Sequence, residues 1–567
     1  MRLRVPFLFF SLAILALVAV SFYVNGRFLG IDDAHIFFNY AENICRGNGV
    51  TYSNNGVTVE GYTSPLWLLI CVLNFQLGFN EIGVFACSIA FLLLAQKIWI
   101  DILDQLVAPC HTTAFIGRLA YFVMILSSFG YITWMTVTLM DSVLWGGLLA
   151  WMTKVFIRAI KSETLNYIDA VPFLLAPLCR PEAMFVCPVN LGLLLVYRWQ
   201  HGKHVRDILW TGVVFALSLL AITAFRKLYF GYPLPNTYYA KVSPSVVYNL
   251  HAGLQYATAF LVSGIVPYLF MACFLVKGLG CLRGIVIPAR RQALGCRDFV
   301  WLWAMALFLP PILTGGDHFA LSRFYQPQYP LFGILVIAAI LPYVKFDGTR
   351  MHKAILCLEM LVFLVSAWSL TSSWLFALKC QSKLENEFTL ARDGMEDGQM
   401  FSDLFRDITP RPVIGVVCAG GIARTYDGRV EDLMGLNNLM VAHSQGERKG
   451  VKNHAAFEVH LFEKINVDVM PFAPEGFYNQ CVKGLCTSGT FAASWRFGKL
   501  RWQGGPWTRK PMLISKRLLA SLLERGDFEF QDTLLWNGSE WAPPEPPRRR
   551  IGFSRDGDRP IKPYGKV

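Results

Sequence analysis

Long apolar runs recur along the first two-thirds of the chain and constrain its fold more than any other feature. A helix needs roughly 20 apolar residues to cross the hydrocarbon core of a bilayer. Two shorter runs, 65–79 and 168–178, could be full spans, re-entrant segments or interfacial helices. We therefore predict a polytopic α-helical membrane protein with about 10 to 12 transmembrane helices. The longer runs occupy residues 5–24, 82–100, 114–130, 139–157, 183–199, 208–225, 257–276, 299–313, 329–344 and 354–378.

The chain carries too few charges for a soluble protein of its length. Of its 567 residues, 54% are hydrophobic and 16% are charged, whereas charged residues make up about 25% of an ordinary soluble domain. Much of the surface must therefore face lipid. The net charge of +13 comes from basic residues spread over short loops and the tail. No nucleic-acid-binding motif accompanies them, so we expect no nucleic-acid partner.

The hydropathy pattern changes after residue 378 and divides the chain. Residues 1–378 form the predicted transmembrane domain, and residues 379–541 have no spanning run and the size of one soluble domain. An apolar run at 413–417 predicts a buried strand that ends at a Gly-Gly pair, so we expect an α/β domain. The tail, 542–567, holds six prolines and seven Lys or Arg residues. It either rests on anionic lipid head groups or is a solvated disordered segment.

Basic residues in the short loops indicate the orientation. Arg2 and Arg4 precede the first run, and five Lys or Arg residues lie in the loop 277–297. Cytoplasmic loops are enriched in these residues. The N-terminus is then cytoplasmic, and the loop 25–63 and the domain 379–541 face outward. The first run could instead be a cleaved signal peptide, but it has no clear small-residue cleavage site.

The first outer loop contains an adjacent pair of carboxylates, Asp32 and Asp33, directly after the first run. Carboxylates at a membrane surface are costly unless they bind a cation or act as acid and base. Neighbouring acids can raise each other's pKa or share a divalent ion. The alternative is a helix N-terminus, where Asp is favoured. Apolar residues at helical spacing follow, at 36, 37, 40, 41 and 44. The two interpretations are compatible.

Other polar groups interrupt apolar stretches in the same half of the chain. Arg180 and Glu182 flank a proline inside an apolar run, as either a functional pair or a buried ion pair that fixes a helix break. The segment Pro-Leu-Pro-Asn at 233–236 predicts a rigid turn, with Lys241 and Arg226 near enough to meet an anion. Asp317, His318 and Arg323 begin a run at the outer face, where each could also be only a loop anchor.

Several of these motifs, in this order, resemble one family. The loop with Ile-Asp-Asp-Ala-His at 31–35 and Glu60-Gly61-Tyr62 resembles the membrane arabinofuranosyltransferases of the mycobacterial cell-wall type and their bacterial relatives, which are GT-C glycosyltransferases. The resemblance covers residues 1 to about 470, and Asp141 stands where that family usually has Glu. Supporting segments are 138–142, Arg-Pro-Glu at 180–182, Pro-Leu-Pro-Asn-Thr at 233–237, Gly-Gly-Asp-His at 315–318 with Arg323-Phe324, 419–422 and 432–437.

The resemblance implies transfer of a sugar, such as arabinofuranose, from a polyprenyl-phosphate donor to a cell-envelope glycan, glycolipid or glycoprotein at the outer face of a bacterial inner membrane. Asp33 is the predicted base, and Asp32 supports it or holds a divalent cation, the one cofactor left open. The remaining predicted site residues fall into two groups. Donor phosphate and sugar are assigned to Arg180, Glu182, Asn236, Lys241, Asp317, His318 and Arg323, and acceptor binding or loop shape to His35, Glu60 and Tyr62.

Two other functional classes fit part of the pattern. A transporter or flippase of lipid-linked sugar would also have many spans and charges near the midplane. The absence of visible repeats and the large outer domain argue against it. A scaffold protein with a decayed site is the third class, and the retained Asp32-Asp33 pair argues against that.

Overall fold

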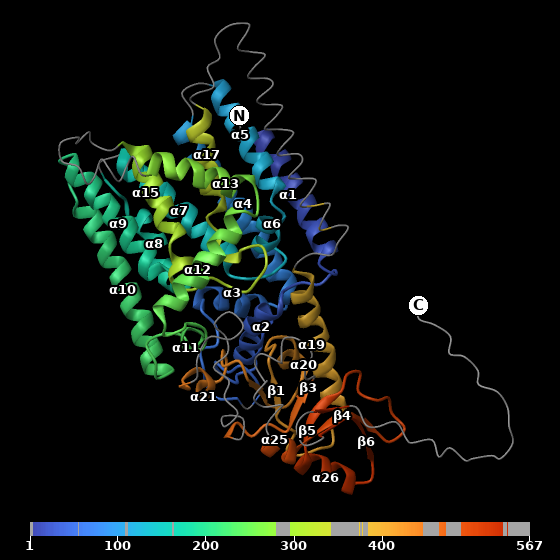
Figure 1. Cartoon of the computed structure of the whole chain (residues 1–567). Coiled ribbons are helices and arrows are strands. Elements are labelled where there is room, and N and C mark those ends of the chain that lie inside the picture. Colours follow the sequence, from blue (N-terminus) through green and yellow to red (C-terminus); the bar gives the residue numbers. More distant parts are fainter. Residues whose placement is uncertain are drawn as a thin grey trace, which may run out of the picture.

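A helical bundle and a C-terminal unit with a sheet lie on opposite sides of one short helix, α2 (Figure 1). Most of the basic loop 277–297, nearly all of the apolar run 354–378 and the tail beyond Ala542 lie outside the described residues. The computed structural model describes residues 4–54, 56–107, 111–161, 164–278, 295–341, 374, 377, 384–445, 464–471, 489–536 and 541–542.

Four of the described helices are long and apolar enough to cross a bilayer: α1 (Arg4–Val24), α4 (Asn80–Val107), α7 (Ser142–Lys161) and α10 (Arg206–Tyr229). Each coincides with a predicted span. They carry large apolar side chains, such as Leu217 and Leu220 on α10, that the described part of the chain leaves exposed. This is the surface expected of a helix in lipid.

Two further predicted spans are bent. Helices α5 (His111–Ser127) and α6 (Phe129–Met135) meet at 74°, and the hydroxyl of Ser128 caps α6 by accepting the backbone N–H of Tyr131. Helix α12 (Val246–Leu261) and the segment beginning with α13 (Ile265–Cys273) meet at 112° next to Gly264. Counting each pair as one span raises the number among the described residues to six. The predicted runs at 114–130 and 257–276 are therefore each interrupted by a bend.

The remaining bundle helices are shorter. The two ambiguous runs are the helices α3 (Pro65–Gln76) and α8 (Tyr167–Cys179), with 12 and 13 residues. Pro172 and Pro177 lie inside α8, which lacks the corresponding backbone donors. The other predicted runs form α9 (Ala183–Gln200), α15 (Cys296–Phe308), α16 (Pro310–Leu313) and α17 (Tyr329–Ile340).

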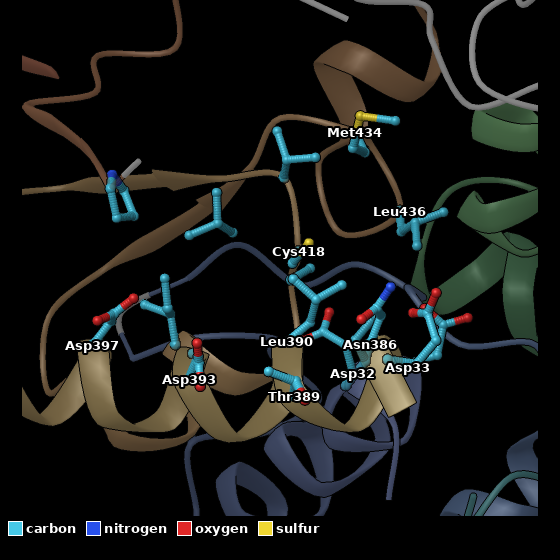
Figure 2. Close-up of a pocket in the computed structure, with 18 of the residues that line it drawn as sticks. Asp32, Asp33, Asn386, Thr389, Leu390, Asp393, Asp397, Cys418, Met434 and Leu436 are labelled. Atoms are coloured by element: carbon cyan, nitrogen blue, oxygen red, sulfur yellow. The ribbon is translucent and has the colours of Figure 1, made fainter. Parts of the chain in front are cut away.

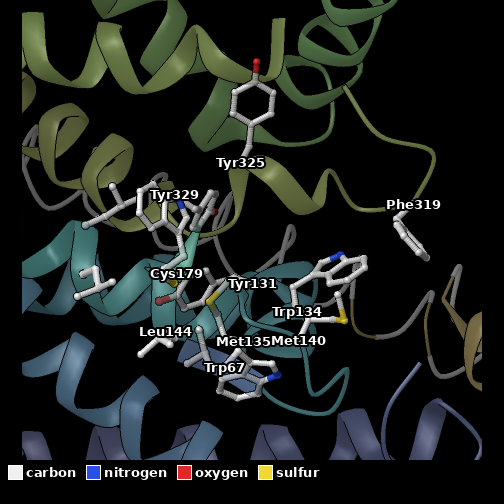
Figure 3. Packing of buried hydrophobic residues seen from close by; sticks show 14 of the residues in the cluster. Trp67, Tyr131, Trp134, Met135, Met140, Leu144, Cys179, Phe319, Tyr325 and Tyr329 are labelled. Atoms are coloured by element: carbon white, nitrogen blue, oxygen red, sulfur yellow. The ribbon is translucent and has the colours of Figure 1, made fainter. Parts of the chain in front are cut away.

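Two buried tryptophan side chains, Trp67 and Trp134, connect loops of the bundle to its core by hydrogen bonds (Figure 3). The indole of Trp67 donates to the carbonyl of Leu139 at 3.2 Å, and that of Trp134 donates to Ala320 at 3.1 Å. Both indoles are buried. Because a buried indole N–H needs a partner, these bonds fix the two loops that carry Asp141 and Arg323.

The C-terminal unit confirms the predicted α/β character. After α19 (Glu385–Leu404), the predicted strand appears as β1 (Ile414–Val416), which pairs in parallel with β2 (Val430–Asp432) and β3 (Val469–Pro471). The other pairings are antiparallel, and the seven strands lie in the order β2-β1-β3-β5-β4-β6-β7. The remaining elements are α20 (Gly421–Thr425), α21 (Leu439–Ala442), α25 (Gly489–Ser494), β4 (Trp495–Trp502), β5 (Met512–Ser515), α26 (Lys516–Glu524), β6 (Phe528–Trp536) and β7 (Trp541–Ala542).

Helix α2 (Asp32–Cys45) is buried from both sides because the C-terminal unit packs on it. A Cβ at Gly420 would lie 1.9 Å from the backbone oxygen of Asp32, and one at Gly421 would lie 2.3 Å from that of Ala391 on α19. Only glycine permits this approach. Beside it, the buried guanidinium of Arg424 forms ion pairs with Glu42 and Glu81. The C-terminal unit is thus held against the first loop by both backbone packing and charge.

Candidate active site

The start of α2 is set by a short pairing with a distant loop. The backbone N–H groups of Gly30 and Ile31 donate to the carbonyls of Val137 and Thr138, at 2.9 and 3.3 Å. Gly30 has φ +83°, a conformation that glycine adopts without strain. This pairing brings the Asp32-Asp33 pair beside the loop that carries Asp141. Neither aspartate is the N-cap, because Ile31 occupies that position.

Asp32 holds the two halves of the molecule together. Its carboxylate oxygens accept the backbone N–H groups of Gly420 and Gly421, each at 2.9 Å. Burial raises the pKa of Asp32 to about 6, although these two bonds act in the opposite direction. Both oxygens are therefore engaged in a structural contact.

Asp33 points away from that contact and is half-buried. Its Oδ2 atom lies 3.5 Å from a terminal guanidinium nitrogen of Arg323 and 3.9 Å from Nζ of Lys241. These are loose ion pairs compared with a direct N–H···O contact. Asp33 thus has cations beside it without being locked by them.

Asp33 lines a cavity of about 410 Å³ on the side of the helical bundle, which we call the bundle cavity. One part of its wall carries charge, and another is apolar, with Met184, Phe185 and Leu313. Of the predicted site residues, the bundle cavity brings together Asp33, Tyr62, Arg180, Glu182, Lys241, Asp317 and Arg323.

Arg180 enters the bundle cavity where α8 ends. Pro181 follows it, and a residue before proline is driven out of the helical region; Arg180 accordingly has φ −148° and ψ 145°. Its Nη2 and Nε atoms bind the two oxygens of Asp141 at 2.6 and 3.0 Å, and Glu182 lies at 3.4 Å. Arg180 and Asp141 are both buried, so their charges largely neutralise each other.

The loop after α16 presents Arg323 in a fixed orientation. Its Nε atom lies 2.6 Å from Asp317, and its guanidinium stacks over Phe319 at 4.5 Å. Burial alone would raise the pKa of Asp317, but the charge of Arg323 and contacts from His318 hold that pKa below its usual range. Asp317 therefore acts as an anchor for Arg323. His318 itself lines a different cavity, described below.

Several predicted residues lie outside both cavities. The amide of Asn236 donates to the carbonyls of Gly435 and Leu436 at 2.8 and 2.9 Å, which docks the turn before α11 (Asn236–Lys241) on the C-terminal unit. Glu60 binds the Nε atom of Arg226 at 2.9 Å. Both side chains are buried, so the anion-binding interpretation of Arg226 is not supported: its charge is already paired.

His35 is buried and lies between aromatic rings. Its ring stacks on Phe28 with centroids 5.5 Å apart and meets the edge of Phe38. Burial lowers the pKa of His35 to about 3, so the ring is neutral at physiological pH. The position fits a role in shaping the first loop.

A second cavity, of about 470 Å³, lies between α19 and the loop after β1, and we call it the α19 cleft (Figure 2). Asp33 stands at one end of the cleft and Asp397 at the other, with Thr389 and Asp393 between them. Asp33, Ile36 and Leu436 line both the bundle cavity and the α19 cleft. Asp33 is therefore the polar group through which the two spaces meet.

No family model matches the chain, and no curated protein matches it in sequence. Solved structures do resemble it. The crystal structure of ArnT from Cupriavidus metallidurans bound to undecaprenyl phosphate matches with a TM-score of 0.51 and 12% identity, over 89% of this chain and 97% of that one. Archaeal oligosaccharyltransferase AglB from Archaeoglobus fulgidus, in complex with an inhibitory peptide and a dolichol-phosphate, matches with a TM-score of 0.49 and 10% identity, over 90% and 74%.

The chain has the GT-C fold. This confirms the fold class that the sequence motifs predicted.

The residues around Asp32 and Asp33 do not fit a divalent cation. Both oxygens of Asp32 already accept backbone N–H groups, and Asp33 faces Arg323 and Lys241. Within the described ranges, no group of three His, Cys, Asp or Glu side chains could hold a metal ion. Such an ion normally needs several oxygen ligands together.

Glu387 lines the α19 cleft with Asp33 but is not among the predicted site residues. The sequence of α19 does contain a pattern that points to this cleft. The cleft-lining residues Asn386, Thr389, Leu390, Asp393 and Asp397 recur at helical spacing, opposite a buried stripe that includes Phe388 and Ala391. This spacing predicts an amphipathic helix. It does not predict that the helix lies beside Asp33, because the two are more than 350 positions apart in the sequence.

Proposed function

We propose that this protein is a membrane glycosyltransferase that moves a sugar from a polyprenyl-phosphate donor to a cell-envelope acceptor, with Asp33 as the base. The observation that carries the proposal is the position of Asp33, between a cavity with cationic and apolar walls and a second cleft with one polar wall and one apolar wall. A lipid phosphate needs both kinds of wall in one cavity. The fold shared with ArnT, whose crystal structure holds undecaprenyl phosphate, supports the same class of donor.

The proposed reaction needs two tasks from the chain. Asp33 takes the proton from the acceptor hydroxyl as its oxygen bonds to the anomeric carbon of the sugar. The bond from that carbon to the phosphate oxygen breaks, and the electron pair leaves with the polyprenyl phosphate. Lys241 and Arg323, held within 4 Å of Asp33, stabilise the charge that develops on the phosphate.

The finer assignments rest on the resemblance of the motifs. The sugar is a furanose such as arabinofuranose, and the active site and the C-terminal unit face away from the cytoplasm of a bacterial cell. The basic N-terminus and the basic loop 277–297 support this orientation.

Lys241→Met should weaken donor binding about tenfold or more, because a charge-assisted contact to phosphate contributes about 1.5–3 kcal/mol. Binding of polyprenyl phosphate to the purified full-length protein is the measurement. Lys227→Met is the matched control, since Lys227 is exposed and bonds only the Gly231 carbonyl among the described residues. Equal affinity in the two variants would remove Lys241 from the phosphate site.

A cysteine introduced at Asp403 should react with a membrane-impermeant maleimide in intact cells. Asp403 is 53% exposed on α19 and bonds Arg406 and Gln399 of the described residues, so the change is tolerated. The wild-type protein, with its own cysteines, provides the background. Labelling that appears only after the membrane is permeabilised would reverse the proposed orientation.

A further inference from the structure

The α19 cleft has a polar side chain, Glu387, close to the proposed base. One wall of the cleft consists of α19 residues from Asn386 to Asp397, a length of about 16 Å at the helical rise of 1.5 Å per residue. The opposite wall is aliphatic, with Val416, Val417 and Met434. An elongated space with one polar wall and one apolar wall matches a sugar chain, whose rings have polar edges and apolar faces.

The acidic groups of the cleft differ in their pairing. Asp393 bonds Arg509 at 2.9 Å and Lys510 at 3.3 Å, and Asp397 lies 3.8 Å from Lys510. These ion pairs form the far end of the cleft. The side-chain carboxyl of Glu387 has no hydrogen-bond or ion-pair partner within the described residues, and it lies at the end of the cleft nearest Asp33.

We propose that the α19 cleft binds the acceptor, that this acceptor is a neutral polyhydroxylated glycan, and that Glu387 accepts a hydrogen bond from a hydroxyl of its reacting sugar. The assignment of an acceptor rests on the proposed function. The assignment of a glycan site rests on the cleft itself.

The surroundings of Glu387 fit this role. Burial raises its pKa to about 7, and the nearby charges of Asp33, Asp32 and Asp317 act in the same direction, while Arg323 acts against them. A carboxyl group with such a pKa can both donate to and accept from hydroxyl groups near neutral pH. A neutral polyol is the kind of ligand that uses both capacities.

Other acceptor classes fit the cleft less well. A phosphorylated head group would be repelled by the carboxylates of Asp32, Asp33 and Glu387, and the Lys510 ammonium at the far end is already paired with Asp393 and Asp397. An extended peptide could not add as a strand beside β1, because β1 is paired with β2 on one side and β3 on the other.

The test uses the full-length protein in lipid nanodiscs and neutral trisaccharides of arabinofuranose, galactofuranose and mannose as probes. The variant is Glu387→Gln. The matched control is Glu385→Gln, the same change in the same helical turn at a position that does not line the cleft. At about pH 8, where Glu387 is ionised, a neutral trisaccharide should bind the wild type and Glu385→Gln equally, and Glu387→Gln about tenfold or more weakly, because the charge-assisted hydrogen bond to the carboxylate is lost.

Leu390→Trp provides a steric variant. Leu390 lines the cleft and is 42% exposed, so the larger ring enters the cleft without entering the core. Trisaccharide binding should then be lost, while the affinity for polyprenyl phosphate stays at the wild-type value in all variants. That second readout separates an effect on the cleft from general misfolding.

Three outcomes would overturn the inference: no neutral trisaccharide binds the wild type, a phosphorylated trisaccharide binds better than its neutral form, or Glu387→Gln binds as Glu385→Gln does. Failure of the wild type to bind polyprenyl phosphate, with trisaccharide binding intact, would instead remove the proposed function and leave the glycan site in place.

Discussion

Asp33→Asn should lower sugar transfer about 10²–10⁴-fold, the usual contribution of a positioned general base. The change preserves the shape of the side chain and leaves Asp32 to hold Gly420 and Gly421. Thermal stability and affinity for polyprenyl phosphate should therefore stay near the wild-type values. The measurement is turnover of a synthetic polyprenyl-phosphate sugar by the purified protein.

Asp32→Asn provides the contrast. Each carboxylate oxygen of Asp32 accepts one backbone N–H, so in asparagine the NH2 group would replace one of these acceptors and face the N–H of Gly420 or Gly421. The main effect of the substitution should be lower thermal stability, with less loss of turnover in the protein that remains folded. Near-normal transfer by a folded Asp33→Asn protein would rule out Asp33 as the base.

Arg180→Ala should lower the free energy of unfolding by about 3–5 kcal/mol, because it leaves the carboxylate of Asp141 buried without its partner. The double change Arg180→Met with Asp141→Leu removes both charges and should recover much of the stability. Transfer should stay low in both proteins if Arg180 also contacts the donor in the bundle cavity.

Arg118→Ala is the matched control for this pair. Arg118 also binds an aspartate through two nitrogens, at 2.8 and 2.6 Å, but its side chain and that of Asp104 are about a quarter exposed. Ion pairs of that kind contribute about 0.2–1 kcal/mol. Thermal denaturation in one detergent compares all these proteins. Equal losses from Arg118→Ala and Arg180→Ala would show that burial of the Asp141 pair carries no special energetic weight.

The features that sequence predicted are those fixed by local chemistry. Helices α1, α4, α7 and α10 follow from long apolar runs, and β1 follows from a short apolar run ending at Gly420-Gly421. The proline after Arg180 predicted a helix break, and α8 does end there. In each case, the residues that decide the structure lie within the element or directly beside it.

The features that sequence missed depend on partners far along the chain. Asp32 accepts hydrogen bonds from Gly420 and Gly421, nearly 390 positions away. The motif around Asp32 therefore does not predict its structural role. Arg226 was read as an anion-binding residue because its partner Glu60 lies in another segment. The bends at Ser128 and Gly264 were missed because an apolar run has the same composition whether it is straight or broken.

The glycine contact between the two halves also has a consequence for how such proteins can evolve. Gly420 and Gly421 present consecutive N–H groups to the aspartate beside the proposed base, and no side chain fits at either position. If recombination exchanged the chain after residue 379, the new segment would also need two glycines whose backbone N–H groups reach the carboxylate of Asp32. The hydropathy boundary is therefore a poor crossover point, and we expect the two halves to be exchanged only together.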